Sequence, residues 1–148
     1  AALFDAVAAT QPVSLLDFAA RLDALQRFAA LPEAAALAAA NKRARNILKK
    51  VEGALRDSID ASKLVEPAER ELHAALVAAL ADTDAALAVR DYVAVLSRLA
   101  ALRQPVDTFF DSVMVMADDP AIRDNRLALL KALADRFATV AAIEQLAT

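Results

Sequence analysis

The sequence predicts an all-α protein, a bundle of five to six helices forming one domain over residues 1–148, and three observations support this. Apolar residues recur at helical spacing along nearly the whole chain. The chain has one glycine in 148 residues, too few for the many tight turns of a hairpin-rich β-protein. The one run that favours a strand, Val113–Met116, lies inside a helical period, so we expect it to be helical.

Three helical segments are expected in the first third of the chain. Residues 1–9 have the pattern of a helix tail that began upstream, so we expect the chain to be a fragment of a longer one. Ser14 is placed to cap the second helix, with Asp17 near its positive end. The apolar stripe of that helix comprises Leu15, Phe18, Leu22, Leu25 and Phe28. Pro32 suits a first turn, and a third helix is expected from there to about Lys50.

The middle of the chain is predicted to be a loop followed by a long helix. Between Gly53 and Val65 the helical pattern weakens, and serine and aspartate compete for backbone hydrogen bonds there. Pro67 restarts a helix, with fraying expected near Asp82–Asp84.

Two or three further helices complete the bundle. Asp91 is a plausible cap for the next helix, and Pro105 should kink that helix or start a new one. Asp119 and Pro120 form a cap and a first-turn proline for a last helix that should reach about Ala141.

The composition excludes several kinds of chemistry. One glycine cannot form a glycine-rich phosphate loop, and the lack of cysteine removes disulfides, thiolate metal sites and cysteine nucleophiles. A single histidine cannot supply a multi-histidine metal site. We therefore expect this chain to have no catalytic residues, no metal and no cofactor of its own. The apolar runs are also far shorter than the roughly 20 residues of a membrane span.

One basic segment stands out against the overall net charge of −3. On a helix, Asn41–Val51 places its apolar residues on one side and its polar residues on the other. The polar residues are Lys42, Arg43, Arg45, Asn46, Lys49 and Lys50. Such a cationic strip can neutralise phosphates of a nucleic-acid backbone. A solvated face whose long side chains cover apolar surface is the alternative interpretation.

Arg126 occupies a position on an apolar stripe, where a charge needs a partner. Asp107 and Asp111 on the preceding helix are candidates, and we expect a structural ion pair between Arg126 and Asp111. The alternative is an arginine held for a ligand, with Asn125 beside it. His73 should form an ordinary surface pair with Glu69 one turn earlier. All aromatic residues except Phe4 fall on core stripes, so RNA contacts would come mostly from cations and polar groups.

Three segments closely resemble the C-terminal region of bacterial glycyl-tRNA synthetase β subunits. They are LAAANKRARNILKK (Leu37–Lys50), ASKLVEPAERELHAAL (Ala61–Leu76) and LRQPVDTFFDSVMVMADDPAIRDNRLALLKAL (Leu102–Leu133). FFDSVMVM together with IRDNRL is the most specific part, and the resemblance covers nearly the whole chain. Two features depart from the family: its V-A-D-I-S type ending is replaced by residues 140–144, VAAIE, and Asp91–Ala94 stands where a D-A-L-R string is expected.

The resemblance implies a helical anticodon-binding domain of the DALR type. It implies that the chain grips the anticodon arm of tRNA-Gly in a cytoplasmic αβ ligase, with the α subunit and the rest of the β subunit as partners. ATP and magnesium would serve the catalytic subunit, and neither DNA nor a membrane is expected as a partner. The basic strip then gains a role, with Arg45 and Asn46 reaching base edges and Arg103 and Arg123 as secondary contacts. A non-catalytic helical module that docks a partner subunit is the alternative function.

Overall fold

The computed structural model describes residues 2–12, 14–51, 53 and 55–147, and these residues form helices and loops without a β-strand. The all-α prediction is therefore confirmed for the part described. The α-helices are α1 (Ala2–Ala8), α2 (Leu15–Ala29), α3 (Ala34–Lys49), α4 (Pro67–Ala88), α5 (Tyr92–Ala100), α6 (Arg103–Ser112) and α7 (Pro120–Ala138). Two short 3-10 helices, η1 (Ala61–Lys63) and η2 (Ile143–Leu146), lie in the connections.

The described residues form seven α-helices, against the five to six expected, and the break before Pro105 accounts for one of them. Helix α5 ends at Ala100, and α6 begins at Arg103, so Pro105 lies in the first turn of a new helix. A proline costs little there, because first-turn N–H groups have no partner within the helix. The sequence-based expectation of a fresh start at this proline is confirmed.

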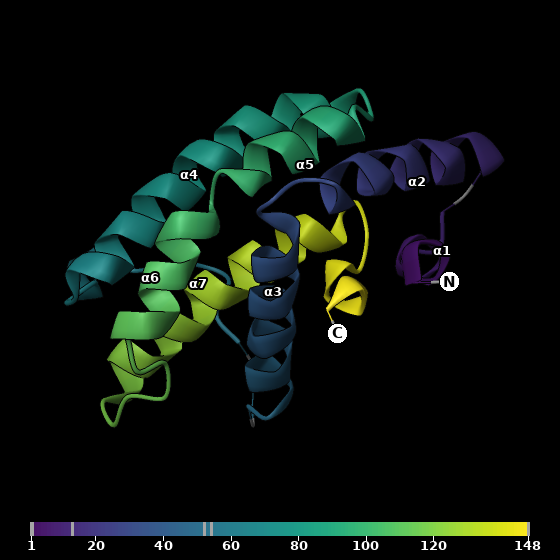
Figure 1. Cartoon of the computed structure of the whole chain (residues 1–148). Helices are drawn as coiled ribbons and strands as arrows, with labels where there is room; N and C mark the ends of the chain where they lie inside the picture. The colour runs from purple at the N-terminus through teal and green to yellow at the C-terminus, as the bar shows by residue number, and fades with distance from the viewer. Residues whose placement is uncertain (1, 13, 52, 54, 148) are drawn as a thin grey trace.

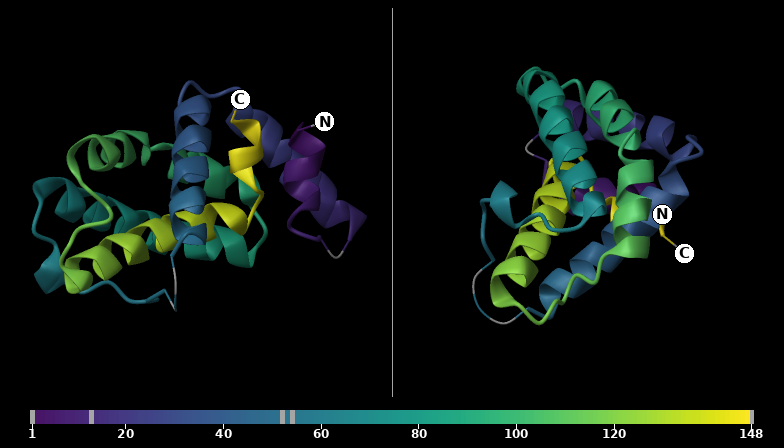
Figure 2. Two further views of the ribbon diagram at one scale, coloured as in Figure 1. Left: turned by 90° about the horizontal axis from the view of Figure 1, so that it is seen from below. Right: turned by 90° about the vertical axis from the view of Figure 1, so that its left-hand side faces the viewer.

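Helix α7 packs against α3 and α4, as Figures 1 and 2 show. Helix α4 packs against α5 and α6, and α3 lies across α7. The C-terminal η2 lies between α3 and α1, which the view from below shows most clearly (Figure 2, left). None of the helices in the described part of the chain has the length and apolar content to cross a membrane.

Helix α7 is the centre of the core. Six consecutive residues, Asn125–Leu130, are buried, as are Leu133, Ala134 and Phe137. The solvent-facing side of α7 is narrow and carries Asp124, Lys131 and Asp135, which recur at helical spacing. Phe28 of α2 packs against Phe137, with ring centroids 6.2 Å apart.

The predicted helix starts are confirmed by their caps. The Ser14 side chain accepts a hydrogen bond from the Asp17 N–H at 3.1 Å, and Asp91 accepts from the Ala94 N–H at 3.1 Å. Asp119 accepts from the Ala121 N–H at 2.9 Å. Each cap satisfies an N–H group that the helix itself leaves without a partner.

The prediction that Val113–Met116 is helical is wrong. Helix α6 ends at Ser112, and Val113 has an extended backbone. Val113 and Val115 are buried, whereas the exposed fractions of Met114 and Met116 are 73% and 51%. Buried and exposed residues alternate here although the chain bends at Val115, and four apolar residues are too few to distinguish this pattern from a helical face.

Three smaller expectations also need correction. Helix α4 is continuous through Asp82–Asp84, because Thr83 hydrogen-bonds to Ala79 and both aspartates pair with arginines of other helices. Leu15 lies at the exposed start of α2 and is 88% exposed, although it continues the apolar stripe. Helix α7 ends at Ala138, and the residues that follow turn back into the core, where Ile143 is fully buried.

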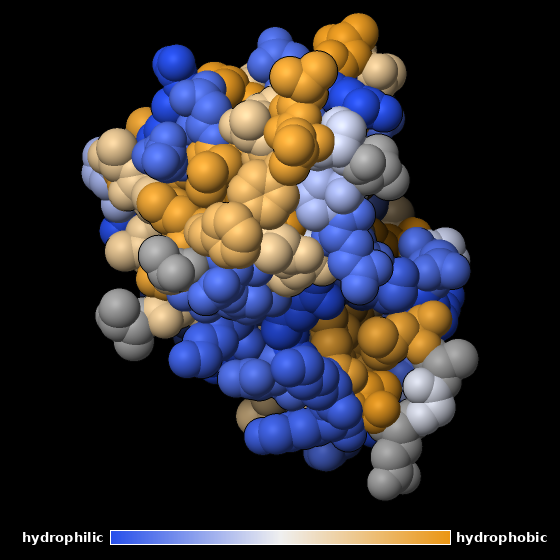
Figure 3. Space-filling view, turned by 90° about the vertical axis from the view of Figure 1, so that its right-hand side faces the viewer, coloured by the Kyte–Doolittle hydropathy of each residue, from blue (hydrophilic) through white to orange (hydrophobic). Residues whose placement is uncertain are grey.

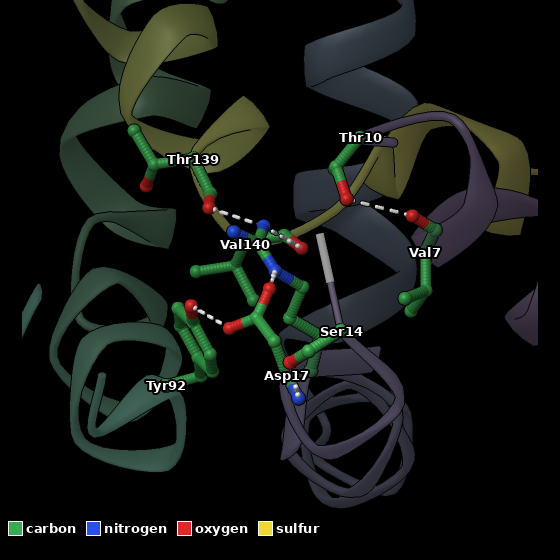
Figure 4. Close-up of polar contacts among 8 residues, drawn as sticks. Val7, Thr10, Ser14, Asp17, Tyr92, Thr139 and Val140 are labelled. Atoms are coloured by element: carbon green, nitrogen blue, oxygen red, sulfur yellow. Dashed lines mark hydrogen bonds and ion pairs between the residues drawn. The ribbon is translucent and has the colours of Figure 1, made fainter. Parts of the chain in front are cut away.

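A charged network joins α2, α5 and the end of α7. The Tyr92 hydroxyl donates a hydrogen bond to Asp17 at 2.5 Å, and Figure 4 shows the two side chains pointing toward one another. Arg21 lies over the Tyr92 ring, pairs with Asp17 and donates to the Thr139 and Val140 carbonyls. Burial raises the pKa of Tyr92, and its hydrogen bond to Asp17 raises that pKa further. Burial alone would raise the pKa of Asp17, but the bonds from Tyr92 and Arg21 outweigh it and lower that pKa.

Candidate nucleic-acid interface

The basic strip lies on α3 as the helical pattern predicted. Ala44 on the opposite side is fully buried, and Ile47 and Leu48 are half-buried against the core. Lys42, Arg43, Asn46, Lys49 and Lys50 are exposed, and Arg45 is half-buried. Figure 3 views the molecule from the right-hand side of Figure 1, and hydrophilic side chains gather over the lower left of this face beside an apolar area.

Side chains at the two edges of the strip contact other parts of the protein, whereas the lysines at its centre are exposed to solvent. At one edge the Arg45 guanidinium lies 3.6 Å from the Glu144 carboxylate of η2. At the other edge the Arg43 guanidinium lies over the Phe110 ring of α6, 4.6 Å from its centroid. Lys42, Lys49 and Lys50 between them form no ion pair with a carboxylate in the described ranges. Their charge is therefore available to a ligand in solvent.

Asn41, directly before the strip, is a residue that the sequence did not single out as part of the site. It is only 1% exposed, and its side-chain amide donates a hydrogen bond to Glu144 at 2.9 Å. Asn41 and Arg45, one turn apart, thus hold the same carboxylate. The partner lies 103 residues further along the chain, so only the fold could identify this contact.

A hollow of about 850 Å³ lies between α1, α3 and η2. Its walls carry Lys42, Arg45, Asn46 and Lys49 from α3, Asp5 and Thr10 from the α1 region, and Glu144 and Gln145 from η2. The volume is within the range of pockets that hold small organic ligands. Cations of α3 line the hollow together with carboxylates and an amide from α1 and η2, so the hollow can bind a group that carries both a phosphate and hydrogen-bonding edges.

The two secondary candidates lie away from this hollow. Arg103 is exposed in the first turn of α6 and pairs with Asp107 at 3.4 Å. Arg123 is half-buried on α7 and lines a separate hollow of about 280 Å³ beside Val51 and Arg56. Arg123 is therefore near the end of α3, and the fold does not bring Arg103 and Arg123 together.

Arg126 forms a buried ion pair, but the predicted partner Asp111 is wrong. The Arg126 guanidinium lies 2.8 Å from Glu69 of α4 and also donates to the Met114 carbonyl. Asp111 is exposed. Asp107, the other candidate, pairs with Arg103. The pair therefore ties α7 to α4 and to the segment after α6.

The contacts of Glu69 and Asn125 confirm that this is a structural cluster. Glu69 is fully buried and accepts hydrogen bonds from Arg126 and from the Glu66 N–H. The surface pair expected between Glu69 and His73 is therefore wrong. Asn125 accepts from the Asp60 N–H at 2.7 Å and donates to the Asp60 carbonyl at 3.0 Å. Asn125 thus fixes the loop before η1, and its side chain has protein partners.

Most of the aromatic rings that could stack on bases are inside the core. Tyr92 and Phe109 are buried, and Phe110 is half-buried beneath Arg43. Phe4 is 55% exposed and packs against Phe18 in a tilted arrangement, with ring centroids 4.9 Å apart. In the part of the chain that the structure describes, no group of three or more His, Cys, Asp or Glu side chains could hold a metal ion.

The described residues thus form an all-α bundle that exposes a cationic face of α3. The chain belongs to the DALR anticodon binding domain family, which it matches over residues 37–143. It is 61% identical over 145 residues to the glycine–tRNA ligase beta subunit of Xanthomonas campestris pv. campestris (strain 8004), with 98% of this chain and 21% of that protein covered. The beta subunit of Xylella fastidiosa (strain M12) is 54% identical over 143 residues, covering 97% of this chain and 20% of that protein. The chain thus spans about a fifth of the length of these curated relatives.

Proposed function

We propose that this chain is the part of a glycine–tRNA ligase β subunit that binds the anticodon arm of tRNA-Gly. It orients the tRNA for aminoacylation that is carried out elsewhere in a cytoplasmic αβ complex, where a catalytic subunit uses ATP and magnesium. The membership in the DALR family and the similarity to glycine–tRNA ligase beta subunits support this proposal. The structural observation that carries it is the open centre of the α3 strip, Lys42, Lys49 and Lys50.

Phosphate binding is the physical basis of the proposal. Lysine side chains in solvent attract phosphates, and each neutralised phosphate releases counterions from the nucleic acid. The strip holds five cations, but the whole chain has a net charge of −3. The isolated chain should therefore bind weakly, and the remaining domains of the ligase should add affinity through effective concentration.

Charge reversal tests the proposal directly. The variant Lys42→Glu, Arg43→Glu, Lys49→Glu should lose at least tenfold in affinity for a tRNA-Gly anticodon stem-loop, measured by fluorescence anisotropy at low salt. A matched variant with Arg27, Lys63 and Arg90 changed to Glu carries the same charge but leaves α3 intact, and it should bind more tightly than the first. Circular dichroism should show equal helicity. Equal binding by the two variants would show that the strip does not contact RNA.

A partner-docking function is the second candidate, and a different observation favours it. Leu15 and Leu16, in the first turn of α2, are 88% and 85% exposed. Exposed leucines are costly in water and are typical of protein interfaces. If docking is the function, Leu15→Ser with Leu16→Ser should weaken binding to the α subunit or to the rest of the β subunit. RNA affinity should then be unaffected by those changes.

A further inference from the structure

We propose that the hollow between α1, α3 and η2 binds one unpaired nucleotide, and that Glu144 selects a base that presents an exocyclic amine. This inference rests on the proposed RNA-binding function and adds to it a specificity-determining residue. The hollow is lined by cations of α3 and by the acidic Glu144 of η2, and these two kinds of group suit the two ends of a nucleotide.

The phosphate would lie against α3. Lys42 and Lys49 both line the hollow and are two helical turns apart, about 10 Å along the axis. Neither lysine forms an ion pair with a described carboxylate. Lysine ammonium groups on long stems can therefore contact phosphates on either side of a nucleotide whose base enters the hollow.

Glu144 is held in a fixed position beside the lysines, by two residues of α3 itself. One carboxylate oxygen accepts from the Asn41 amide at 2.9 Å, and the other lies 3.6 Å from the Arg45 guanidinium. The side chain is still 24% exposed. Because each carboxylate oxygen can accept two hydrogen bonds, Glu144 keeps acceptor capacity that faces the hollow.

A carboxylate in a cationic groove discriminates between base edges. It repels phosphate and the carbonyl oxygens of a base, and it accepts hydrogen bonds from an amine such as N4 of cytosine. Uracil has the same size and stacking surface, but it presents a carbonyl at that position. A site whose acceptor is already oriented should therefore favour cytosine over uracil by about tenfold.

The experiment compares two oligonucleotides that differ only in this group. Fluorescence anisotropy with labelled hexamers of cytidylate and of uridylate, at low salt and neutral pH, should show tighter binding of the cytidylate hexamer. Glu144→Gln keeps a carbonyl that can accept from Asn41, but its amide donates to uracil, so the preference should shrink at least threefold. Asp118→Asn removes the same charge at an exposed loop position outside the hollow and should leave the preference unchanged.

The variants separate this inference from the function on which it rests. Lys42→Ala with Lys49→Ala should weaken both hexamers by a similar factor. If these lysine changes reduce binding but cytidylate and uridylate bind equally to the unmodified chain, base selection by Glu144 is wrong and the RNA-binding function stands. If the lysine changes have no effect on either hexamer, both proposals fail. Thermal denaturation of Glu144→Gln checks that η2 remains docked.

Discussion

Arg126 is a buried charged residue on the apolar stripe of α7. Its environment shows why the partner of a buried charge is hard to predict from sequence. Its position on the apolar stripe was recognised from the sequence, but its partner comes from α4, 57 residues away. The pair is incompletely satisfied, since the Arg126 Nε and one Glu69 oxygen are buried without a hydrogen-bond partner in the described residues. A buried pair of this kind adds little net stability, but breaking it leaves one charge uncompensated.

Removing one partner of the pair should therefore be severe. Arg126→Leu should lower the free energy of unfolding by about 3–5 kcal/mol, because Glu69 remains buried without its cationic partner. Glu69→Leu combined with Arg126→Met should recover most of that loss, as measured by denaturant unfolding. RNA affinity of the folded Arg126→Leu protein should be unchanged. Lost affinity with unchanged stability would instead indicate that Arg126 serves a ligand.

Tyr92 makes stability depend on pH in the alkaline range. Its pKa is raised above the usual 10.0, so the folded state holds the phenolic proton more tightly than the unfolded chain does. That stabilisation is fully present below pH 10 and is lost as the pH rises through the higher folded pKa. Tyr92→Phe should cost about 2 kcal/mol at neutral pH, since Asp17 loses a buried donor. The difference between Tyr92→Phe and the unmodified chain should shrink when unfolding is measured at about pH 11.

At the scale of elements, η2 is the piece on which the candidate site depends. Ile143 anchors it in the core, the Ala142 N–H donates to the Ala6 carbonyl, and Asn41 and Arg45 hold Glu144. Residues from opposite ends of the chain thus complete a hollow with α3. The apolar pattern indicated where α3 lies, but no local pattern in the last ten residues indicated that they fold back onto it.

Loss of the Asn41 contact should loosen η2 alone. Asn41→Ala should speed amide hydrogen exchange at Gln145 and Ala147, whose N–H groups bond within this turn, by about tenfold. Amides in the middle of α4 and α7 should exchange as before. Uniformly faster exchange along the chain would show that Asn41 supports the whole bundle instead.

At the scale of the whole molecule, the acidic total and the basic face are compatible because the charges are separated in space. Carboxylates on several helices pair with neighbouring arginines, as Asp82 does with Arg98 and Asp84 with Arg136. The centre of the α3 strip has no such pairing among the residues described. Binding to RNA should therefore follow the local potential of this face and not the net charge.

The salt dependence of RNA affinity tests whether the α3 strip binds phosphates. With three to five phosphates neutralised, the logarithm of the affinity for an anticodon stem-loop should fall with the logarithm of salt at a slope of about −2 to −3.5. Affinity should drop roughly 20- to 100-fold between 50 and 200 mM salt in fluorescence anisotropy. A slope near zero would show that the contact is not made through phosphates.

The sequence by itself determined the helical class, most helix starts and the polar face of α3, because caps, prolines and 3.6-residue spacing act within one or two turns. It also determined that Arg126 needs a partner. Only the tertiary structure decided that the partner is Glu69, that α6 ends before Val113, and that Glu144 lines the same hollow as Lys42 and Lys49. These contacts join segments that are tens of residues apart in the chain. Their energies depend on how the helices pack around one another, and the local spacing of residues carries no information about that packing.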